Sequence, residues 1–168
     1  MMRIPHKLTN MNMFLDGVGF AGLVTEITLP VIKFKSEDHQ GGGMDAPISI
    51  EMGMEPLEAS FVLSSYETEV FAAAGFQENV STGIICRGAL KKDDEVIPLN
   101  VVLRGRIEEI DFGTWKPGDE SSMKFTLKVD FYQLMKGVVE LCYIDIKSSI
   151  RRIGGKDQLD AVRAALLL

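Results

Sequence analysis

Residues 123–134 read MKFTLKVDFYQL, and this segment decides the fold class. Apolar and polar side chains alternate along it with a period of two, which is the spacing of a β-strand with one buried face. A strand of this length is about twice as long as usual. The residues predicted to face inward are Phe125, Leu127, Val129 and Phe131, and those predicted to face outward are Lys124, Thr126, Lys128, Asp130 and Tyr132.

The segment 96–110 predicts a second long strand, with Pro98 near its start. Long strands in an open sheet leave unpaired edges that invite pairing with other chains. We therefore expect a β-barrel that closes either within the subunit or between identical copies. The alternation places Val101, Leu103, Gly105 and Ile107 on one face, and Asn100, Val102, Arg104, Arg106 and Glu108 on the other.

Shorter strands are expected through most of the remaining chain, which makes the protein mainly β. Asp16-Gly17 is a strong hairpin signal, and Pro30 interrupts a strand because proline cannot donate to a ladder. We expect residues 48–52 and 57–64 to pair with each other as a hairpin. The other predicted strands are 11–15, 18–20, 23–29, 82–90, 138–144 and a segment that ends at residue 153 before a Gly154-Gly155 turn.

A short helix is predicted over residues 66–74. The preceding Ser64-Ser65-Tyr66-Glu67 has the form of a capping box, in which serine and glutamate each satisfy a free backbone N–H group. Gly75 is suited to end this helix. We expect Phe71 and Ala74 to pack onto the sheet.

A second helix is predicted over residues 158–167, with Asp157 as its cap. Its apolar residues recur at helical spacing and form one stripe. The simplest expectation is that this stripe packs on the subunit's own sheet, and contact with a neighbouring copy is the alternative. The stripe consists of Leu159, Val162, Ala165 and Leu166.

A polar, glycine-rich segment spans residues 36–47. Gly41, Gly42 and Gly43 give its backbone unusual freedom, and the polar residues before them bury nothing. We expect an extended arm that becomes ordered on a partner, and an ordinary surface loop is the alternative. Phosphate binding is disfavoured because no Gly-Lys-Ser/Thr motif follows the glycines. The apolar residues expected to anchor the arm to a sheet are Val31, Phe34, Ile48, Ile50 and Met52.

The chain of 168 residues is expected to form one domain over residues 1–168. It carries 24 acidic and 18 basic residues, a net charge of −6, which disfavours a nucleic-acid partner held by its phosphates. The longest uncharged stretch, residues 17–25, is far shorter than the ~20 apolar residues of a membrane-spanning helix. No secretory signal is visible, so folding in the cytoplasm is expected.

The sequence offers no constellation of catalytic, metal-binding or cofactor-binding residues. Cys86 and Cys142 lie in apolar runs and are expected to be buried free thiols. His6 and His39 are far apart in the sequence, so a zinc site is not expected. The nucleophile-elbow and zinc-protease motifs are also missing. We therefore expect a protein that has no cofactor and is not an enzyme.

Several short motifs occur together in a specific order. Because of these motifs, the sequence resembles the major tail tube protein of contractile-tailed bacteriophages, a group that includes the tubes of R-type pyocins. The resemblance extends from Leu8 to Leu168. The order and spacing carry this resemblance, and residues 66–95 match least. The motifs are LTNMN (8–12) with Asp16-Gly17, TLP (28–30), GGMDAP (42–47), VLRGR (102–106) with EID (109–111), WKPG (115–118) and YID (143–145).

The resemblance implies a β-sandwich or barrel subunit that assembles into hexameric rings around a wide inner barrel. Six copies with about four strands each would give a barrel on the order of 40 Å across, which admits a DNA duplex. The implied rings stack head to tail inside the sheath and meet the baseplate and tail terminator proteins. The resemblance also implies that DNA passes through the tube without specific binding. The implied location is the virion tail, assembled in the host cytoplasm.

Two alternative functions remain open. The first is the tube of an R-type pyocin or of a type VI secretion-like injection device. Such a tube would have the same ring architecture but would carry no DNA. The second is a small-molecule-binding β-barrel that closes on itself as a monomer.

Two sets of site residues follow from the implied tube. The arm would reach the next ring, and an acidic lumen would let DNA slide without sticking, since six copies at −6 give about −36 per ring. The hypothetical inter-ring contacts are Glu37, Asp38, Gly41, Gly42, Gly43 and Met44. The hypothetical lumen residues are Glu51, Glu55, Glu58, Glu108 and Asp130.

Overall fold

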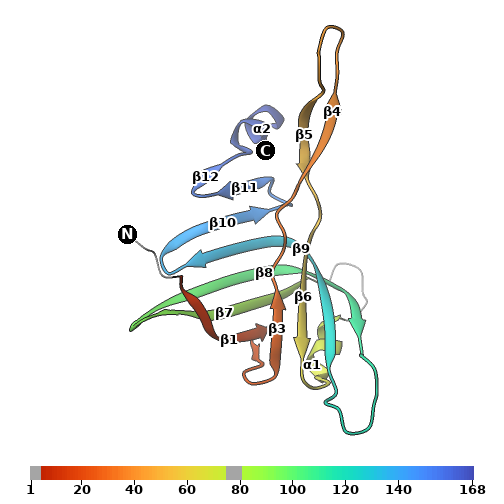
Figure 1. Cartoon of the computed structure of the whole chain (residues 1–168), viewed down its shortest axis with the longest axis vertical. Coiled ribbons are helices and arrows are strands. Elements are labelled where there is room, and N and C mark those ends of the chain that lie inside the picture. Colours follow the sequence, from red (N-terminus) through yellow and green to blue (C-terminus); the bar gives the residue numbers. More distant parts are fainter. Residues whose placement is uncertain (1–4, 75–80) are drawn as a thin grey trace.

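The computed structural model of the chain describes residues 5–74 and 81–168 (Figure 1). The strands and helices in these ranges are β1 (Lys7–Leu15), β2 (Val18–Gly19), β3 (Val24–Thr28), β4 (Phe34–His39), β5 (Ile48–Met54), β6 (Leu57–Leu63), α1 (Thr68–Ala74), β7 (Thr82–Lys92), β8 (Glu95–Asp111), β9 (Met123–Lys136), β10 (Val139–Asp145), β11 (Ile150–Ile153), β12 (Lys156–Asp157) and α2 (Asp160–Leu166). The mainly β fold predicted from the sequence is confirmed.

The long strands β8 and β9 organise the main sheet. Its strand order is β12-β11-β10-β9-β8-β7-β1-β2, and β6 and then β3 attach to β9. The first half of β9 pairs with β6, from Met123 opposite Leu63 to Val129 opposite Leu57. Its second half pairs with β10. Because β9 changes neighbours halfway along, the sheet divides into two parts, and the hydrophobic core draws side chains from both.

The change of neighbours occurs beside Gly105. The register between β8 and β9 shifts there, so that Arg104 lies opposite Phe131 while Gly105 lies opposite Val129. The extra residue between them on β9 is Asp130, which makes this a β-bulge. A Cβ atom added to Gly105 would lie 1.8 Å from the Lys128 carbonyl oxygen, so only glycine fits.

The bulge corrects the predicted faces of β9. An extra residue reverses the alternation beyond it, so Tyr132 is buried in the core although we expected it to face outward. Phe131 is also buried, but on the opposite face, where the Arg104 guanidinium lies 4.1 Å from its ring centroid. The inward positions before the bulge agree with the prediction. These are Phe125, Leu127 and Val129.

Both cysteines are buried free thiols, as predicted. Burial raises the pKa of Cys86 to about 12 and that of Cys142 to about 11. At neutral pH both side chains are therefore protonated members of the core.

The predicted pairing of residues 48–52 with 57–64 is wrong. β5 pairs with β4 in a separate two-stranded sheet, whereas β6 pairs with β3 and β9. Glu55 and Pro56 separate β5 from β6. The backbone N–H of Glu55 donates to the Lys33 carbonyl at 2.8 Å, which ties Glu55 to the residue directly before β4 and not to β6.

Helix α1 is present but starts later than predicted. Ser64 lies four residues before Thr68, the first residue of the helix, and is therefore not at its N-cap position. Its hydroxyl donates to the Leu23 carbonyl at 3.2 Å. Ala74 is buried as expected, but Val70 packs into the core in place of the exposed Phe71. The predicted helix end at Gly75 lies outside the described residues.

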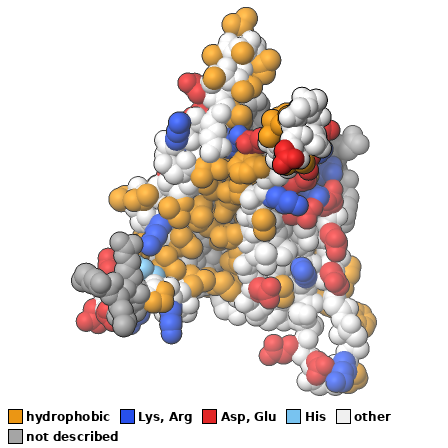
Figure 2. Space-filling view, turned by 45° about the horizontal axis from the view of Figure 1, so that its top comes forward, with side chains coloured by type: hydrophobic (Ala, Val, Ile, Leu, Met, Phe, Trp, Pro, Cys, Tyr) orange, Lys and Arg blue, Asp and Glu red, His pale blue; other side chains and the backbone are white. Residues whose placement is uncertain are grey.

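Helix α2 does not pack on the subunit's own sheet, contrary to expectation, since none of its residues is buried. The predicted cap is wrong, because the N-cap residue is Leu159, which makes no side-chain cap hydrogen bond. An Asp157 carboxylate oxygen accepts a hydrogen bond from the Leu159 N–H at 3.0 Å, one residue before the helix begins. Figure 2 shows apolar side chains gathered at the surface of the molecule. In the described ranges no helix is long and apolar enough to cross a bilayer.

Candidate assembly surfaces

The arm is a β-hairpin that projects from one end of the molecule (Figure 1). We predicted a loop over residues 36–47, but Ser36 to His39 belong to β4 and pair with β5. The expected anchoring is wrong as well. The side chains of Val31, Phe34, Ile48, Ile50 and Met52 are exposed and do not join the core. A strand pair can form here without the main sheet because its backbone groups bond to each other.

The arm tip is a compact turn. The Met44 N–H donates to the Gly41 carbonyl at 3.2 Å, and the Gln40 side-chain amide donates to the Met44 carbonyl at 3.2 Å. Gly43 has a φ of +88°, which side chains rarely tolerate. Alanine at Gly41 would make only ordinary van der Waals contacts, the nearest at 3.6 Å, and alanine at Gly42 would meet nothing within 4 Å. Of the proposed inter-ring residues, Gly41, Gly42, Gly43 and Met44 thus form the tip, and Glu37 and Asp38 lie on β4.

One arginine holds the base of the arm against β11. An Arg151 Nη atom lies 2.7 Å from a Glu51 carboxylate oxygen on β5, and the guanidinium carbon is 4.9 Å from the ring centroid of Phe34 on β4. The Arg151 side chain is only 9% exposed. Its Nε atom is buried and has no hydrogen-bond partner among the described residues. Arg151 therefore contacts both strands of the arm, β4 through Phe34 and β5 through Glu51.

We predict that Arg151→Ala loosens the arm. A partly buried, charge-assisted hydrogen bond contributes about 1.5–3 kcal/mol, so amide hydrogen exchange in β4 and β5 should become roughly tenfold faster or more. Exchange in β8 and β9 should stay unchanged, which separates local loosening from global destabilisation. Arg152→Ala is a matched control, because Arg152 pairs with Glu140 on β10 and not with the arm. Unchanged exchange in the arm of Arg151→Ala would contradict this role.

The proposed lumen carboxylates do not form one cluster. Glu58 on β6 and Glu108 on β8 meet around Lys128 on β9, whose ammonium group pairs with Glu58 and lies 3.6 Å from Glu108. Glu51 lies at the arm base on Arg151, while Asp130 pairs with Lys147 at 2.6 Å. Glu55 follows β5 and is partly exposed. Four of the five carboxylates are thus ion-paired.

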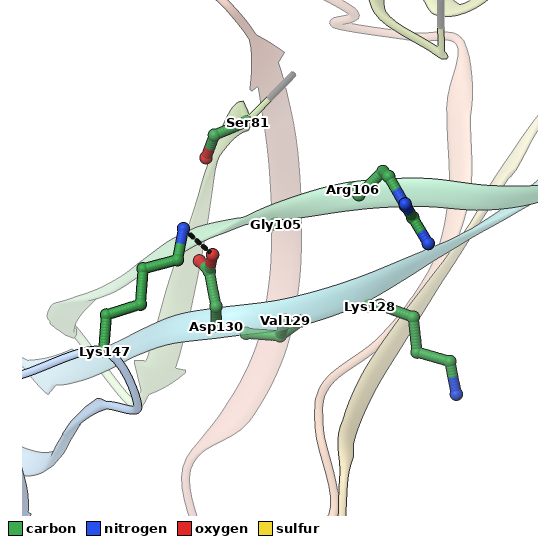
Figure 3. Close-up of a pocket in the computed structure, with 7 residues that line it drawn as sticks. All are labelled: Ser81, Gly105, Arg106, Lys128, Val129, Asp130 and Lys147. Atoms are coloured by element: carbon green, nitrogen blue, oxygen red, sulfur yellow. Dashed lines mark ion pairs between the residues drawn. The ribbon is translucent and has the colours of Figure 1, made fainter. Parts of the chain in front are cut away.

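A shallow pocket of about 430 Å³ lies beside the bulge (Figure 3). Lys147 reaches Asp130 there, whereas Arg106 and Lys128 point away from that pair. The lining residues do not converge on a common point, so the pocket offers no catalytic arrangement. Across residues 5–74 and 81–168, no group of three or more His, Cys, Asp or Glu side chains could hold a metal ion.

An aromatic cluster occupies the end of the molecule opposite the arm, at the loop between β8 and β9 (Figure 1). The indole N–H of Trp115 donates to the Tyr66 hydroxyl at 2.7 Å, and that hydroxyl donates to the Phe112 carbonyl at 2.6 Å. Phe71 stacks on Phe112, while Trp115 remains 81% exposed. The sequence-based expectations include the WKPG motif at residues 115–118 but not this cluster. A tryptophan in a polar Pro-Gly loop was the available signal.

Comparison with known proteins identifies the family. Residues 5–166 match the family model described as phage tail tube protein FII. The chain belongs to this family. It is 31% identical over 170 residues to the tail tube protein of Escherichia phage P2, covering 96% of this chain and 97% of that protein. It is also 31% identical over 158 residues to the major tail tube protein of Serratia phage KSP20, covering 93% and 92%.

Solved structures with little sequence identity share the fold. The sheath–tube complex of the extracellular contractile injection system PVC contains a chain with a TM-score of 0.61 and 12% identity, covering 79% of this chain and 92% of that one. The tube-terminating cap of the anti-feeding prophage gives a TM-score of 0.63 and 10% identity, with 81% and 94% covered.

The family assignment confirms the resemblance seen in the sequence. As a tail tube protein, this chain is a structural component of the phage virion and not an enzyme. The small-molecule-binding barrel is thereby set aside.

Proposed function

We propose that six copies of the tail tube chain form a ring and that rings stack head to tail into the hollow inner tube of a contractile tail. The observation that carries the proposal is the family match over residues 5–166. The arm adds support, because within the described part of the chain β4 and β5 pair only with each other, and they extend away from the body. Contacts between unlike surfaces of one chain produce rings and filaments, whereas like surfaces produce closed dimers.

Open sheet edges support closure between copies. Among the described residues, β1 pairs with β2 only at Phe14 and Leu15, which leaves its outer side unpaired from Lys7 to Asn12. At the other end of the sheet, the outermost strand of the described part is β12, whose two residues pair with β11 and leave its outer side unpaired. Unpaired strand edges are templates for pairing with another chain. A neighbour in the ring would continue the ladder at these two edges.

Electron microscopy of the purified protein tests tube formation. Concentrated wild-type protein is expected to form hollow cylinders of uniform diameter, alone or after addition of a baseplate that nucleates growth. A protein that stays monomeric under both conditions would contradict the proposal. The same preparation in analytical ultracentrifugation should show species larger than the monomer.

The expected partners are the sheath, the tail terminator and the baseplate. Support comes from the solved neighbours of the same fold, which are described as a sheath–tube complex, a sheath and tube terminator, and a baseplate. In this arrangement the outer surface of the tube faces the sheath, and its two ends meet the terminator and the baseplate.

The proposed cargo is DNA, which passes through the tube during ejection. The 31% identity to tube proteins of two phages favours this reading. The likeness to contractile injection systems favours the second candidate, a pyocin-like or type VI secretion-like tube without DNA. Neighbouring genes distinguish the two, since portal and terminase genes accompany a DNA-packaging phage and are missing from a tail-like particle.

Charge reversal in the proposed lumen should slow DNA passage. Glu58→Lys combined with Glu108→Lys would place two further cations beside Lys128 and make the surface attract phosphate. We expect slower ejection and roughly tenfold lower infectivity, measured by DNA release from purified particles and by plaque counts.

The double variant Glu58→Gln with Glu108→Gln is the matched control. It removes the same ion pairs without adding positive charge, so it should give an intermediate effect. If tubes with both lysines assemble and release DNA at the wild-type rate, the acidic-lumen hypothesis is wrong.

A further inference from the structure

The arm exposes an apolar face. Every second residue of β5 points to the same side of the hairpin, and on one side these residues are Ile48, Ile50 and Met52. Their exposed fractions are 52%, 44% and 57%. Glu37 and His39 on β4 pair with Ile50 and Ile48 and therefore border this face. We call Ile48, Ile50 and Met52 the apolar arm face.

The opposite face of the arm is held against its own subunit. It carries Phe34 on β4 and Glu51 on β5, and both contact Arg151. Since Glu51 lies between Ile50 and Met52 in the strand, its contact with Arg151 turns the apolar arm face away from the body. Rotating this face onto the subunit would break the Arg151 contacts. Exposed apolar side chains that are fixed in this way indicate a site of association.

Trp115 provides an exposed aromatic surface at the other end of the molecule. The β8–β9 loop that carries it projects from the end opposite the arm (Figure 1). The indole N–H of Trp115 already donates to the Tyr66 hydroxyl, so its 81% exposed ring needs only apolar contacts. A pocket of about 320 Å³ lies beside the ring, with Tyr66 and Pro117 in its lining. We call it the Trp115 pocket.

The Trp115 pocket is suited to uncharged side chains. Its lining holds one cation, Lys116, and one anion, Asp119. The Lys116 Nζ atom lies 3.7 Å from an Asp119 carboxylate oxygen, so the two charges offset each other. Aliphatic side chains can pack on the indole ring without disturbing this pair.

We propose that the apolar arm face of one copy packs into the Trp115 pocket of a copy in the next ring. The proposal rests on the proposed stacking of rings and identifies the surface that receives the arm. Head-to-tail stacking joins opposite ends of the chain, so it brings the arm and the β8–β9 loop together at every junction between rings (Figure 1). Two arms packed on each other would instead join like ends, which closes a dimer and stops growth.

The aromatic ring would supply most of the affinity. A tryptophan buries about 150–250 Å² in a contact, and tryptophan is the residue type most enriched among those that dominate interfaces. In the subunit most of this surface is still in contact with water. Ile48 and Ile50 would cover the ring from the side that the Tyr66 bond leaves free.

Tryptophan fluorescence tests the contact, because Trp115 is the single tryptophan of the chain. Acrylamide should quench its emission efficiently in the unassembled subunit, where the ring is exposed. Assembly should shift the emission to shorter wavelength and lower the quenching constant roughly threefold or more, because the centre of a contact excludes solvent.

The outcomes separate this contact from the proposed function. Tubes seen by electron microscopy whose emission and quenching match those of the free subunit would overturn the contact alone. A change that appears only after sheath protein is added would also overturn it, since another chain would then cover Trp115. If the wild-type chain forms no tubes, the proposed function fails as well.

Disulfide trapping identifies the segment that covers Trp115. Ile48→Cys and Ser121→Cys, which lies in the pocket lining, are mixed in equal amounts, assembled into tubes and oxidised. The mixture should give a linked dimer on a non-reducing gel, and neither variant alone should do so. The double variant should give a ladder, because each chain can link to the rings above and below. Cys86 and Cys142 are buried and protonated, so they add little background.

The matched control uses Ser49→Cys in place of Ile48→Cys. Ser49 is the next residue of β5 and points to the opposite face of the arm. Its mixture with Ser121→Cys should give several-fold less linked dimer. Equal linking in the two mixtures would overturn the proposed face. Linked dimers from Ile48→Cys alone would show that arms pack on each other, which also overturns the proposal.

Assembly of Ile48→Asp and of Trp115→Ala provides a further readout. A carboxylate in an apolar contact opposes docking, and loss of the ring removes the contact, so the protein concentration needed for tube growth should rise about tenfold or more. Circular dichroism of both subunits should stay unchanged. Ile48→Val and Trp115→Phe are the conservative controls and should restore most of the growth. Tube growth at the wild-type concentration by Ile48→Asp or by Trp115→Ala would refute this contact.

Discussion

Gly105→Ala is expected to prevent folding of the subunit. The added Cβ atom would lie 1.8 Å from the Lys128 carbonyl oxygen, 2.8 Å from its carbonyl carbon and 3.0 Å from the Val129 Cα atom. All three are backbone atoms that cannot rotate away, so β8 and β9 would have to separate. We expect a loss of more than ~4 kcal/mol, a large part of the about 5–15 kcal/mol that stabilises a typical domain.

Urea unfolding followed by circular dichroism measures this effect. Gly83→Ala is the matched control, since Gly83 lies on β7 directly opposite Arg104, and the nearest atom to its added Cβ is 3.6 Å away. Gly83→Ala should fold with little loss. A Gly105→Ala subunit that unfolds at the wild-type urea concentration would contradict the close approach seen at the bulge.

Shortening the arm is expected to abolish tube growth while the subunit still folds. The change replaces residues 40–47 by Asn-Gly, which closes a two-residue hairpin turn between His39 and Ile48. The replaced residues contribute nothing to the hydrophobic core, so the free energy of unfolding should change by less than about 1 kcal/mol. If the arm tip joins rings, electron microscopy should show single rings or free subunits in place of tubes.

Alanines in the arm tip give a graded version of this experiment. Replacing Gly41, Gly42 and Gly43 together should block tube growth, with most of the effect at Gly43, because its φ of +88° costs an alanine about 1–2 kcal/mol. Gly41→Ala with Gly42→Ala is the matched control and should still grow tubes. Normal tubes from the shortened arm would refute its role between rings.

The sequence predicts most of the β fold because one-sided burial imposes a period of two. The alternation in residues 101–107 and 123–129 is confirmed position by position, and the Asp16-Gly17 turn joins β1 to β2. These features depend on local chemistry. A buried face requires apolar residues at every second position, and a tight turn requires positive φ, which both Asp16 and Gly17 adopt.

The errors have a different origin, because they depend on contacts between distant segments. The bulge at Asp130 is set by the approach of Gly105 to the partner strand, and single-strand periodicity does not contain that information. The arm pairs with itself because β6 is already paired on both sides, by β3 and β9. Arg151 reaches Glu51 across 100 residues, and no local motif marks this pair.

The assembly residues were harder to predict than the fold for the same reason. Alternation identifies which faces are polar, but it does not say which polar face meets solvent, a neighbour or the lumen. The exposed stripe of α2 is an example, because its helical spacing is compatible with packing on its own sheet until the hydrogen bond from Arg163 to the Ser149 carbonyl is known.

A cryo-electron microscopy reconstruction of the assembled protein tests the account most directly. It should show six copies per ring, sheet pairing that continues from β1 of one copy into the next, and an arm that contacts the adjacent ring. A tube whose subunits each complete their own sheet, with the arm free in solvent, would contradict it.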